Sequence, residues 1–209
     1  MDFLIHLDTS LAELISQYGK LIYIILFAVV FVETGLVVMP FLPGDSLLFT
    51  AGAFAGAGTL NFNIIIISLI IAAIAGDTVN YVCGRYFGER VLAWQWRSKP
   101  LVNPVYIEKT KNFYSKYGSK TIVLARFVPI IRTVAPFVAG IGEMNYGKFI
   151  TYNVIGGIMW VISLSVCGYY FGQLEIVKDN FEKVILGIIF ISIIPIFLEI
   201  YKEKKKKGQ

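Results

Sequence analysis

Long apolar runs constrain this chain more than any other feature of its sequence. Runs long enough to cross a bilayer, which takes about 20 apolar residues, occur at residues 63–83, 149–171 and 184–200. A fourth run, at 21–35, is somewhat short. The hydrophobic content is 56% and the mean hydropathy is +0.69, both high for a soluble domain. The sequence therefore predicts an all-α polytopic membrane protein.

Two further apolar stretches are interrupted by prolines. Residues 36–58 contain Pro40, Pro43 and Gly44, and residues 121–142 contain Arg126, Pro129, Arg132 and Pro136. Proline lacks a backbone donor and clashes with the preceding helical turn, so each stretch should split into two half-helices that are too short to cross. We expect two re-entrant hairpins, because non-helical backbone at membrane depth must be surrounded by protein or water.

The chain also contains an internal repeat. Residues 55–88 align without gaps with residues 139–172, and the two copies end in "CGRYFG" and "CGYYFG". Each copy follows a proline-interrupted stretch, so the repeating unit is a hairpin followed by a spanning helix. If the basic segment 85–120 is cytoplasmic, the two copies run in opposite directions. Inverted repeats with broken helices are typical of transporters, and the interrupted segments point to the binding site.

The expected organisation is one membrane domain over residues 1–209. Residues 1–20 lack the basic start and the cleavage site of a signal peptide, and are predicted to form an interfacial helix. Much of the basic excess lies in the segment 85–120 and in the tail 201–209, which places both, with the C-terminus, in the cytoplasm. The net charge of +5 thus indicates topology and not a nucleic-acid partner. The lysines of the tail are also suited to binding anionic lipid headgroups.

Four charged residues stand out in the apolar segments: Glu33, Asp45, Arg126 and Arg132. Each costs about 2.5 to 3.5 kcal/mol at a helix centre, so these side chains should face one another or a wet cavity. Two acids from the first repeat balance two arginines from the second. The sequence therefore predicts that the two hairpins lie close together.

Other interpretations of these residues stay open. Asp45 could cap a half-helix that begins at the next residues, and either arginine could extend to the membrane interface. Glu33 has no basic neighbour in the sequence; burial and a nearby arginine would shift its pKa in opposite directions, which leaves proton uptake open.

Asp77, Asn80 and Tyr81 recur at helical spacing, and Arg85 lies two turns beyond Asp77. They form either a polar face that packs on another helix or a set of ligand contacts. The single histidine is His6, so metal sites and histidine-dependent hydrolysis lack their usual residues. No phosphate-binding glycine loop occurs, and we expect no metal or other cofactor.

Several motifs together resemble the DedA family of bacterial membrane proteins, which is related to the eukaryotic SNARE-associated Golgi proteins of the VTT-domain group. They are "ETGLVVMPFLPGDSLLFTAG", "AGDTVNYVCGRYFG" and "ARFVPIIRTVAPFVAGIG", followed by "NYGKF" and Trp160. In that family an acid before the first hairpin, the aspartate at its tip and two arginines of the second hairpin are needed for function. The resemblance assigns these roles to Glu33, Asp45, Arg126 and Arg132.

The resemblance implies a lipid translocase of the bacterial cytoplasmic membrane that moves a phosphate-bearing lipid, such as undecaprenyl phosphate or a phospholipid, in dependence on the proton gradient. Arg126 and Arg132 would bind the phosphate, while Glu33 and Asp45 would pair with the arginines and carry protons. Such a protein is not an enzyme. The alternatives are a membrane lipid-pyrophosphate phosphatase and a proton- or ion-coupled transporter of small solutes. The oligomeric state, including a homo-oligomer, is left open.

Overall fold

The computed structural model describes residues 19–36, 44–93, 95–96, 99–100, 104–178, 180, 183–184 and 186–188. The predicted interfacial helix 1–20, the first hairpin's Pro40 and Pro43, most of the predicted span 184–200 and the basic tail 201–209 lie outside the described residues, apart from the few positions given. The chain divides into two compact units, which are described separately. Unit 1 comprises Met1–Leu26, Pro43–Ile66 and Ser163–Gln209, and unit 2 comprises Phe27–Leu42 and Ile67–Ile162.

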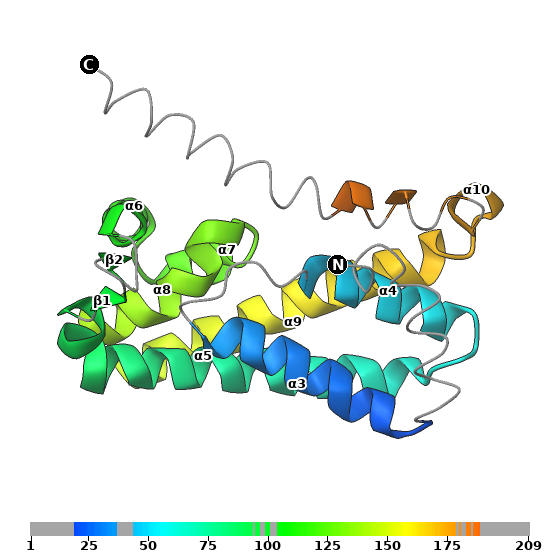
Figure 1. The fold of residues 1–209 in the computed structure, drawn as a ribbon, viewed down its shortest axis with the longest axis horizontal. Coiled ribbons are helices and arrows are strands. Elements are labelled where there is room, and N and C mark those ends of the chain that lie inside the picture. Colours follow the sequence, from blue (N-terminus) through cyan, green and yellow to red (C-terminus); the bar gives the residue numbers. More distant parts are fainter. Residues whose placement is uncertain are drawn as a thin grey trace, which may run out of the picture. The chain divides into compact units, whose positions relative to one another are not determined.

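The described chain is almost entirely helical (Figure 1). Its helices are α3 (Leu21–Gly35), α4 (Gly44–Gly56), α5 (Phe62–Ala93), α6 (Pro104–Tyr117), α7 (Thr121–Ala125), α8 (Pro129–Ile141), α9 (Tyr146–Phe171) and α10 (Glu175–Lys178), with a 3-10 turn at Gly118–Lys120. The exception is a short antiparallel pair of strands, β1 (Gln95–Trp96) and β2 (Lys99–Pro100). This agrees with the predicted all-α class; the single domain over residues 1–209 stays a prediction.

Two of the described helices are long and apolar enough to cross a membrane, at Phe62–Gly88 within α5 and at Tyr146–Phe171 in α9. They agree with the predicted spans 63–83 and 149–171. Helix α5 continues beyond its predicted end to Ala93, so the basic segment starts as helix. Helix α3 has 15 residues and is shorter than a full span, as expected for the run at 21–35.

The second interrupted stretch splits in two, as predicted. Helix α7 ends at Ala125, and Val128 has an extended backbone with φ −119° and ψ 103° before α8 begins. Pro129 lies in the first turn of α8, where its missing N–H is not needed. Pro136, in contrast, lies inside α8 and does not end it. Whether α7 and α8 form a re-entrant hairpin stays a prediction, as it does for the first stretch, of which only Leu36 and residues 44–58 are described.

Each unit packs the second helix of an interrupted stretch against a long helix through glycines. In unit 2, a Cβ at Gly84 of α5 would overlap the carbonyl of Phe137 in α8. In unit 1, a Cβ at Gly168 of α9 would overlap the carbonyl of Phe49 in α4. Gly84 and Gly168 are equivalent in the sequence repeat, so the two units repeat a close helix contact. The opposite orientation of the two copies stays a prediction.

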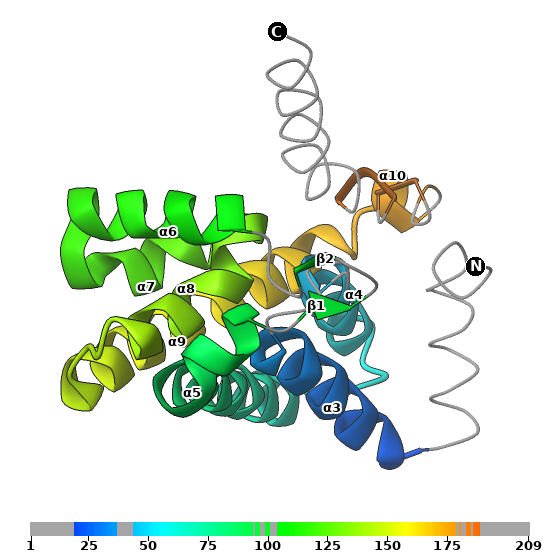
Figure 2. The ribbon, with the colours of Figure 1, turned by 60° about the vertical axis from the view of Figure 1, so that its left-hand side comes forward.

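Helix α6 covers the second interrupted stretch (Figure 2). Buried Ile107 of α6 clusters with Val134 and Val138 of α8. The Tyr114 hydroxyl donates a hydrogen bond of 3.0 Å to the carbonyl oxygen of Ala135. These contacts hold α8 against α6, which belongs to the basic segment 85–120.

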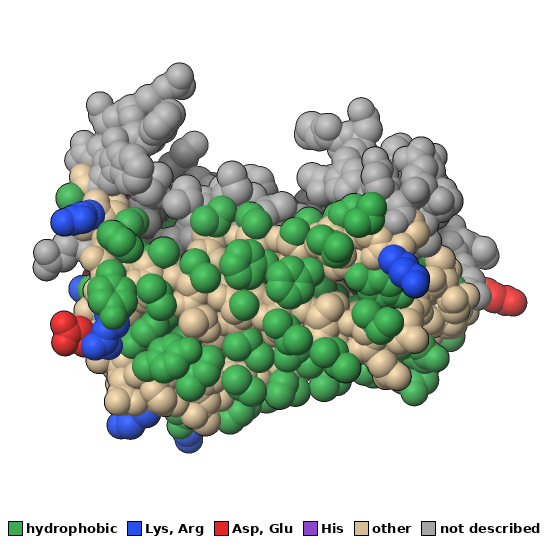
Figure 3. Space-filling model, turned by 90° about the horizontal axis from the view of Figure 1, so that it is seen from below, with side chains coloured by type: hydrophobic (Ala, Val, Ile, Leu, Met, Phe, Trp, Pro, Cys, Tyr) green, Lys and Arg blue, Asp and Glu red, His purple; other side chains and the backbone are tan. Residues whose placement is uncertain are grey.

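Apolar side chains stay exposed along both long helices. On the part of α5 in unit 2 they are Ile67, Ile71, Val79 and Val82, and on the part of α9 in the same unit they are Ile155, Ile158, Met159 and Ile162. Figure 3 shows hydrophobic side chains over most of the face that it presents, with lysine and arginine near its margins. Exposed apolar surface of this kind suits contact with lipid.

Candidate functional site

A neutral cluster of charges is buried in unit 2. Among the side chains whose burial is described, the buried charged ones are Glu33, Asp77, Arg126 and Arg132, with exposed fractions between 1% and 6%. Two carboxylates balance two guanidinium groups. An isolated charge in such surroundings would be strongly destabilising, so each must have a partner.

Glu33 and Arg132 form one ion pair. The Arg132 Nη2 atom lies 2.8 Å from the Glu33 Oε1 atom. Glu33 lies in the last turn of α3 and Arg132 in the first turn of α8, so the pair depends on how these helices pack. Gly76 of α5 allows α3 to approach, because a Cβ there would overlap the Thr34 hydroxyl. The structure thus brings together a predicted acid and a predicted arginine.

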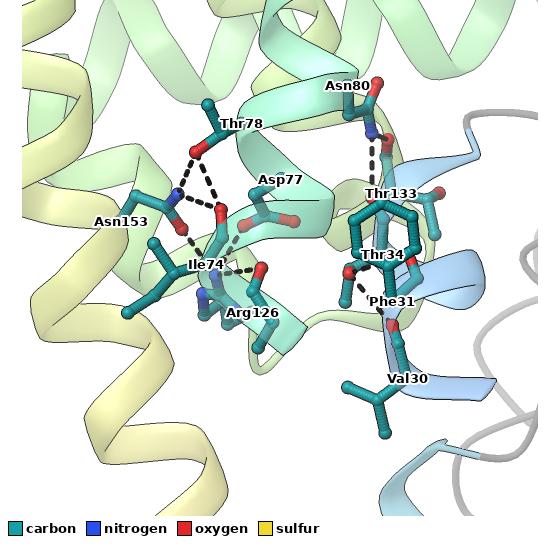
Figure 4. Close-up of polar contacts among 11 residues, drawn as sticks. Val30, Phe31, Thr34, Ile74, Asp77, Thr78, Asn80, Arg126, Thr133 and Asn153 are labelled. Carbon is teal, nitrogen blue, oxygen red and sulfur yellow. Dashed lines mark hydrogen bonds and ion pairs between the residues drawn. The ribbon is translucent and has the colours of Figure 1, made fainter. Parts of the chain in front are cut away.

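Arg126 has a different partner from the one predicted (Figure 4). Its Nη2 atom donates to Asp77 Oδ2 at 2.5 Å and to Asn153 Oδ1 at 2.5 Å. The Asn153 amide nitrogen is held by the Ile74 carbonyl oxygen at 3.1 Å, which orients its oxygen toward the arginine. Asp77 on α5 therefore neutralises Arg126, and Asn153 on α9 is a further contact.

Two glycines of α9 make room for the Arg126 side chain. A Cβ at Gly156 would lie 3.0 Å from Arg126 Cδ and 3.2 Å from Arg126 Nε. A Cβ at Gly157 would lie 3.6 Å from Arg126 Nη2. The guanidinium group therefore lies directly against the α9 backbone.

Both arginines share one aromatic ring. The Cζ atoms of Arg126 and Arg132 lie over the Trp160 ring at 5.9 Å and 4.9 Å from its centroid. Trp160 is 1% exposed. A cation over a desolvated indole gains about 2 kcal/mol, so Trp160 stabilises both guanidinium groups and keeps them in one place.

Several polar atoms of this cluster are buried without a hydrogen-bond partner among the described residues. They are Nε and Nη1 of Arg126, Oδ1 of Asp77 and Oδ1 of Asn80. Buried donors of an arginine left in this way are costly, and an anion would satisfy them. The cluster is thus neutral but retains donors for a negatively charged group.

The other predicted site residues lie as follows. Asp45 is in the first turn of α4 instead of preceding the helix, and it belongs to unit 1, so its predicted contact with the arginines stays a prediction. Arg85 is exposed and donates from Nη1 to the Tyr81 hydroxyl at 3.1 Å, outside the buried cluster. The burial of both Arg126 and Arg132 does not fit extension to the interface.

The sequence-based reasoning missed Asn153 and Trp160 as site residues. Asn153 had a usable signal, since it is an amide inside an apolar span and is followed by a pair of glycines. Trp160 is among the residues that carry the family resemblance, but no role was assigned to it, because a tryptophan in a spanning helix is unremarkable by itself. Within the described part of the chain, no group of three or more His, Cys, Asp or Glu side chains is arranged to hold a metal ion.

Comparison with known proteins gives the family. The VTT domain model matches residues 42–170. Protein DedA of Escherichia coli strain K12 is 51% identical over 207 residues, covering 98% of this chain and 94% of the relative. An uncharacterized membrane protein of Mycobacterium leprae is 38% identical (80% and 74% covered), and inner membrane protein YqjA of E. coli strain K12 is 29% identical (86% and 80% covered). No solved structure matches. Since the domain covers more than half of the chain and its identity to DedA extends over nearly all of it, this protein belongs to the DedA family of membrane proteins.

Proposed function

We propose that this protein is a non-enzymatic lipid translocase that moves a phosphate-bearing lipid, such as undecaprenyl phosphate or a phospholipid, across the bacterial cytoplasmic membrane. The observation that carries the proposal is the placement of two buried arginines over one tryptophan ring. Each arginine is already neutralised by a carboxylate: Asp77 pairs with Arg126, and Glu33 pairs with Arg132. Arginine binds phosphate oxygens through several strong hydrogen bonds.

In this proposal the phosphate headgroup takes the place of the carboxylates. In the empty site, Glu33 and Asp77 keep the guanidinium groups charged and in position. An arriving headgroup contacts Nε and Nη1 of Arg126 first, because these donors have no partner among the described residues. It then competes with Glu33 for Arg132. A site that exchanges one anion for another avoids a state with buried, unpaired arginines.

Proton coupling follows from the same charge balance. The cluster has no net charge before the lipid arrives, so a phosphate brings an excess of negative charge into a buried site. Excess charge at membrane depth is costly. Protonation of Glu33 or Asp77 as the headgroup binds would restore neutrality. Asp45 is included as a second charge partner, on the grounds of the family resemblance.

The proposal places the protein in the inner membrane, which is the location given in the name of its relative YqjA. The basic residues of segment 85–120 and of the tail 201–209 favour a cytoplasmic C-terminus. Two inverted re-entrant hairpins would bring the headgroup site near the midplane, where the lipid tails stay in the bilayer. Neither a cofactor nor an assembly of several copies is needed for this mechanism.

Reconstitution in proteoliposomes tests the proposal. Candidate phospholipids and polyprenyl phosphates are offered with and without a pH gradient, and their transfer between leaflets is measured. We expect transport by the wild type and its loss in Arg126→Ala and in Glu33→Gln, with folding checked by size exclusion. Full activity in both variants would refute the site.

Two other results would replace the proposal. Release of inorganic phosphate from a lipid pyrophosphate by the purified protein would identify a phosphatase. Proton flux that is the same with every headgroup would identify an ion or small-solute transporter.

A further inference from the structure

Asn80 takes no part in either ion pair, yet it bonds the backbone next to both members of the Glu33–Arg132 pair. It is fully buried on α5, one turn beyond Asp77. Its Nδ2 atom lies 2.8 Å from the Thr133 carbonyl oxygen and 3.2 Å from the Thr34 carbonyl oxygen (Figure 4). An amide nitrogen carries two hydrogens, so one can be donated to each carbonyl. One side chain of α5 therefore joins the backbones of α3 and α8.

The two carbonyls belong to the residues that directly follow Glu33 and Arg132. Asn80 thus fixes the backbone next to each member of the ion pair. The pair itself joins side chains at 2.8 Å. A helix shift of one or two ångströms would break that contact, so the backbone position decides whether the pair forms.

The two carbonyls lie in or next to turns that have fewer backbone hydrogen bonds than a regular helix. Thr34 is in the last turn of α3, where carbonyl groups have no donor from the same helix. In α8, Pro136 lacks the N–H that would bond the Arg132 carbonyl, so the backbone next to Thr133 has one helical hydrogen bond fewer. The Asn80 amide therefore supplies a donor to the Thr34 carbonyl and adds a contact to the turn of α8 that lacks the Pro136 N–H.

We propose that Asn80 is a positioning residue whose amide ties α3 to α8 and so places Glu33 against Arg132. The helices then stay in place while the side chains of the pair separate and rejoin around a headgroup. The consequence for transport rests on the function proposed above, whereas the tie between the helices does not.

Trp160 provides a readout that needs no transport. The chain has three tryptophans, and Trp94→Phe with Trp96→Phe leaves Trp160 as the single emitter. Because Arg132 lies 4.9 Å from its ring, the emission should respond to the position of that guanidinium. The variant Asn80→Leu keeps a similar side-chain volume and removes both donors. A matched control is Thr110→Val, which removes a buried hydroxyl that bonds within its own helix α6.

We expect Asn80→Leu to shift the Trp160 emission in the same direction as Arg132→Met, and Thr110→Val to leave it unchanged. Adding Asn80→Leu to Arg132→Met should give no further shift, since both changes act through the same guanidinium. A merely structural role would add its own shift in that background. Asn80→Ala serves in the same comparison if Asn80→Leu does not yield folded protein.

An unchanged emission in Asn80→Leu, or an equal shift with and without Arg132, would overturn the proposal. In proteoliposomes with fluorescent phosphatidylglycerol, Asn80→Leu should lower the initial transport rate about tenfold, in line with the loss of two ordinary hydrogen bonds, and Thr110→Val should not. Transport at the wild-type rate in Asn80→Leu would contradict the role in transport. If the wild type moves no lipid, the proposed function fails, while the Trp160 comparison still decides on the tie.

Discussion

The ion pair of Arg126 and Asp77 shows how much a single residue can matter in this chain. Both side chains are almost fully buried, and the arginine also contacts Asn153 and Trp160. Such a pair is weak evidence for stability, because burying two charges costs about as much as their attraction returns. Removal of one partner is different, since it leaves the other charge buried alone.

We therefore expect Asp77→Asn to lower the free energy of unfolding by about 3 kcal/mol. The double variant Asp77→Leu with Arg126→Met should recover most of this loss, because no charge is left unpaired. Thermal unfolding in detergent measures both. If the double variant were less stable than Asp77→Asn, the two residues would not act as a pair.

Trp160 allows a second test at this scale. Trp160→Leu removes the ring from both arginines, and lipid transport should fall about tenfold or more, as expected for two cation–π contacts of ordinary strength. Trp160→Phe keeps an aromatic face and is expected to retain part of the activity. Equal transport in the two variants would show that the ring's electrostatic face is not what matters.

At the scale of the elements, close helix contacts place these residues. Gly76 lets α3 approach α5, and Gly84 lets α8 approach α5. Since the Glu33–Arg132 pair joins α3 to α8, it depends on both contacts. Proline contributes as well, because the break before Pro129 turns the chain between Arg126 and Arg132.

Gly84→Ala tests this dependence. The new Cβ would overlap the backbone carbonyl of Phe137, which cannot move aside as a side chain can. We expect a loss of about 1 to 3 kcal/mol in the free energy of unfolding, the usual cost of overpacking. Gly187→Ala is the control, as nothing described lies within 4 Å of a Cβ there. Similar stabilities in the two variants would mean that α5 and α8 are not in close contact.

For the whole molecule, the sequence predicts that the two repeated units run in opposite directions. Asn61 and Asn145 are equivalent in the repeat. Each directly precedes its long helix, α5 or α9, and its side-chain oxygen accepts a hydrogen bond from a backbone N–H in the first turn of that helix. The repeat is thus present in local structure and in helix contacts. Its predicted inversion concerns the side of the membrane on which each copy begins.

Cysteine labelling tests the inversion. Thr59 and Glu143 are exposed, equivalent positions in the turns before α5 and α9. With Cys83 and Cys167 replaced by serine, Thr59→Cys should react with a membrane-impermeant maleimide from outside the cell. Glu143→Cys should react only when the cytoplasmic side is opened. Gly208→Cys in the basic tail serves as the cytoplasmic control; labelling of Thr59→Cys and Glu143→Cys from one side would exclude inverted copies.

The sequence by itself determined the helical membrane class, the two long spans, the split of residues 121–142 and the need of Glu33 and both arginines for buried partners. These follow from local chemistry, since apolar length, a missing proline N–H and the cost of a buried charge do not depend on distant residues. Only the tertiary structure decided that Arg126 pairs with Asp77 and Arg132 with Glu33. Charge counting allows several pairings of acids with arginines, and the choice among them depends on helix rotation and on the close contacts at glycines, which no single segment encodes.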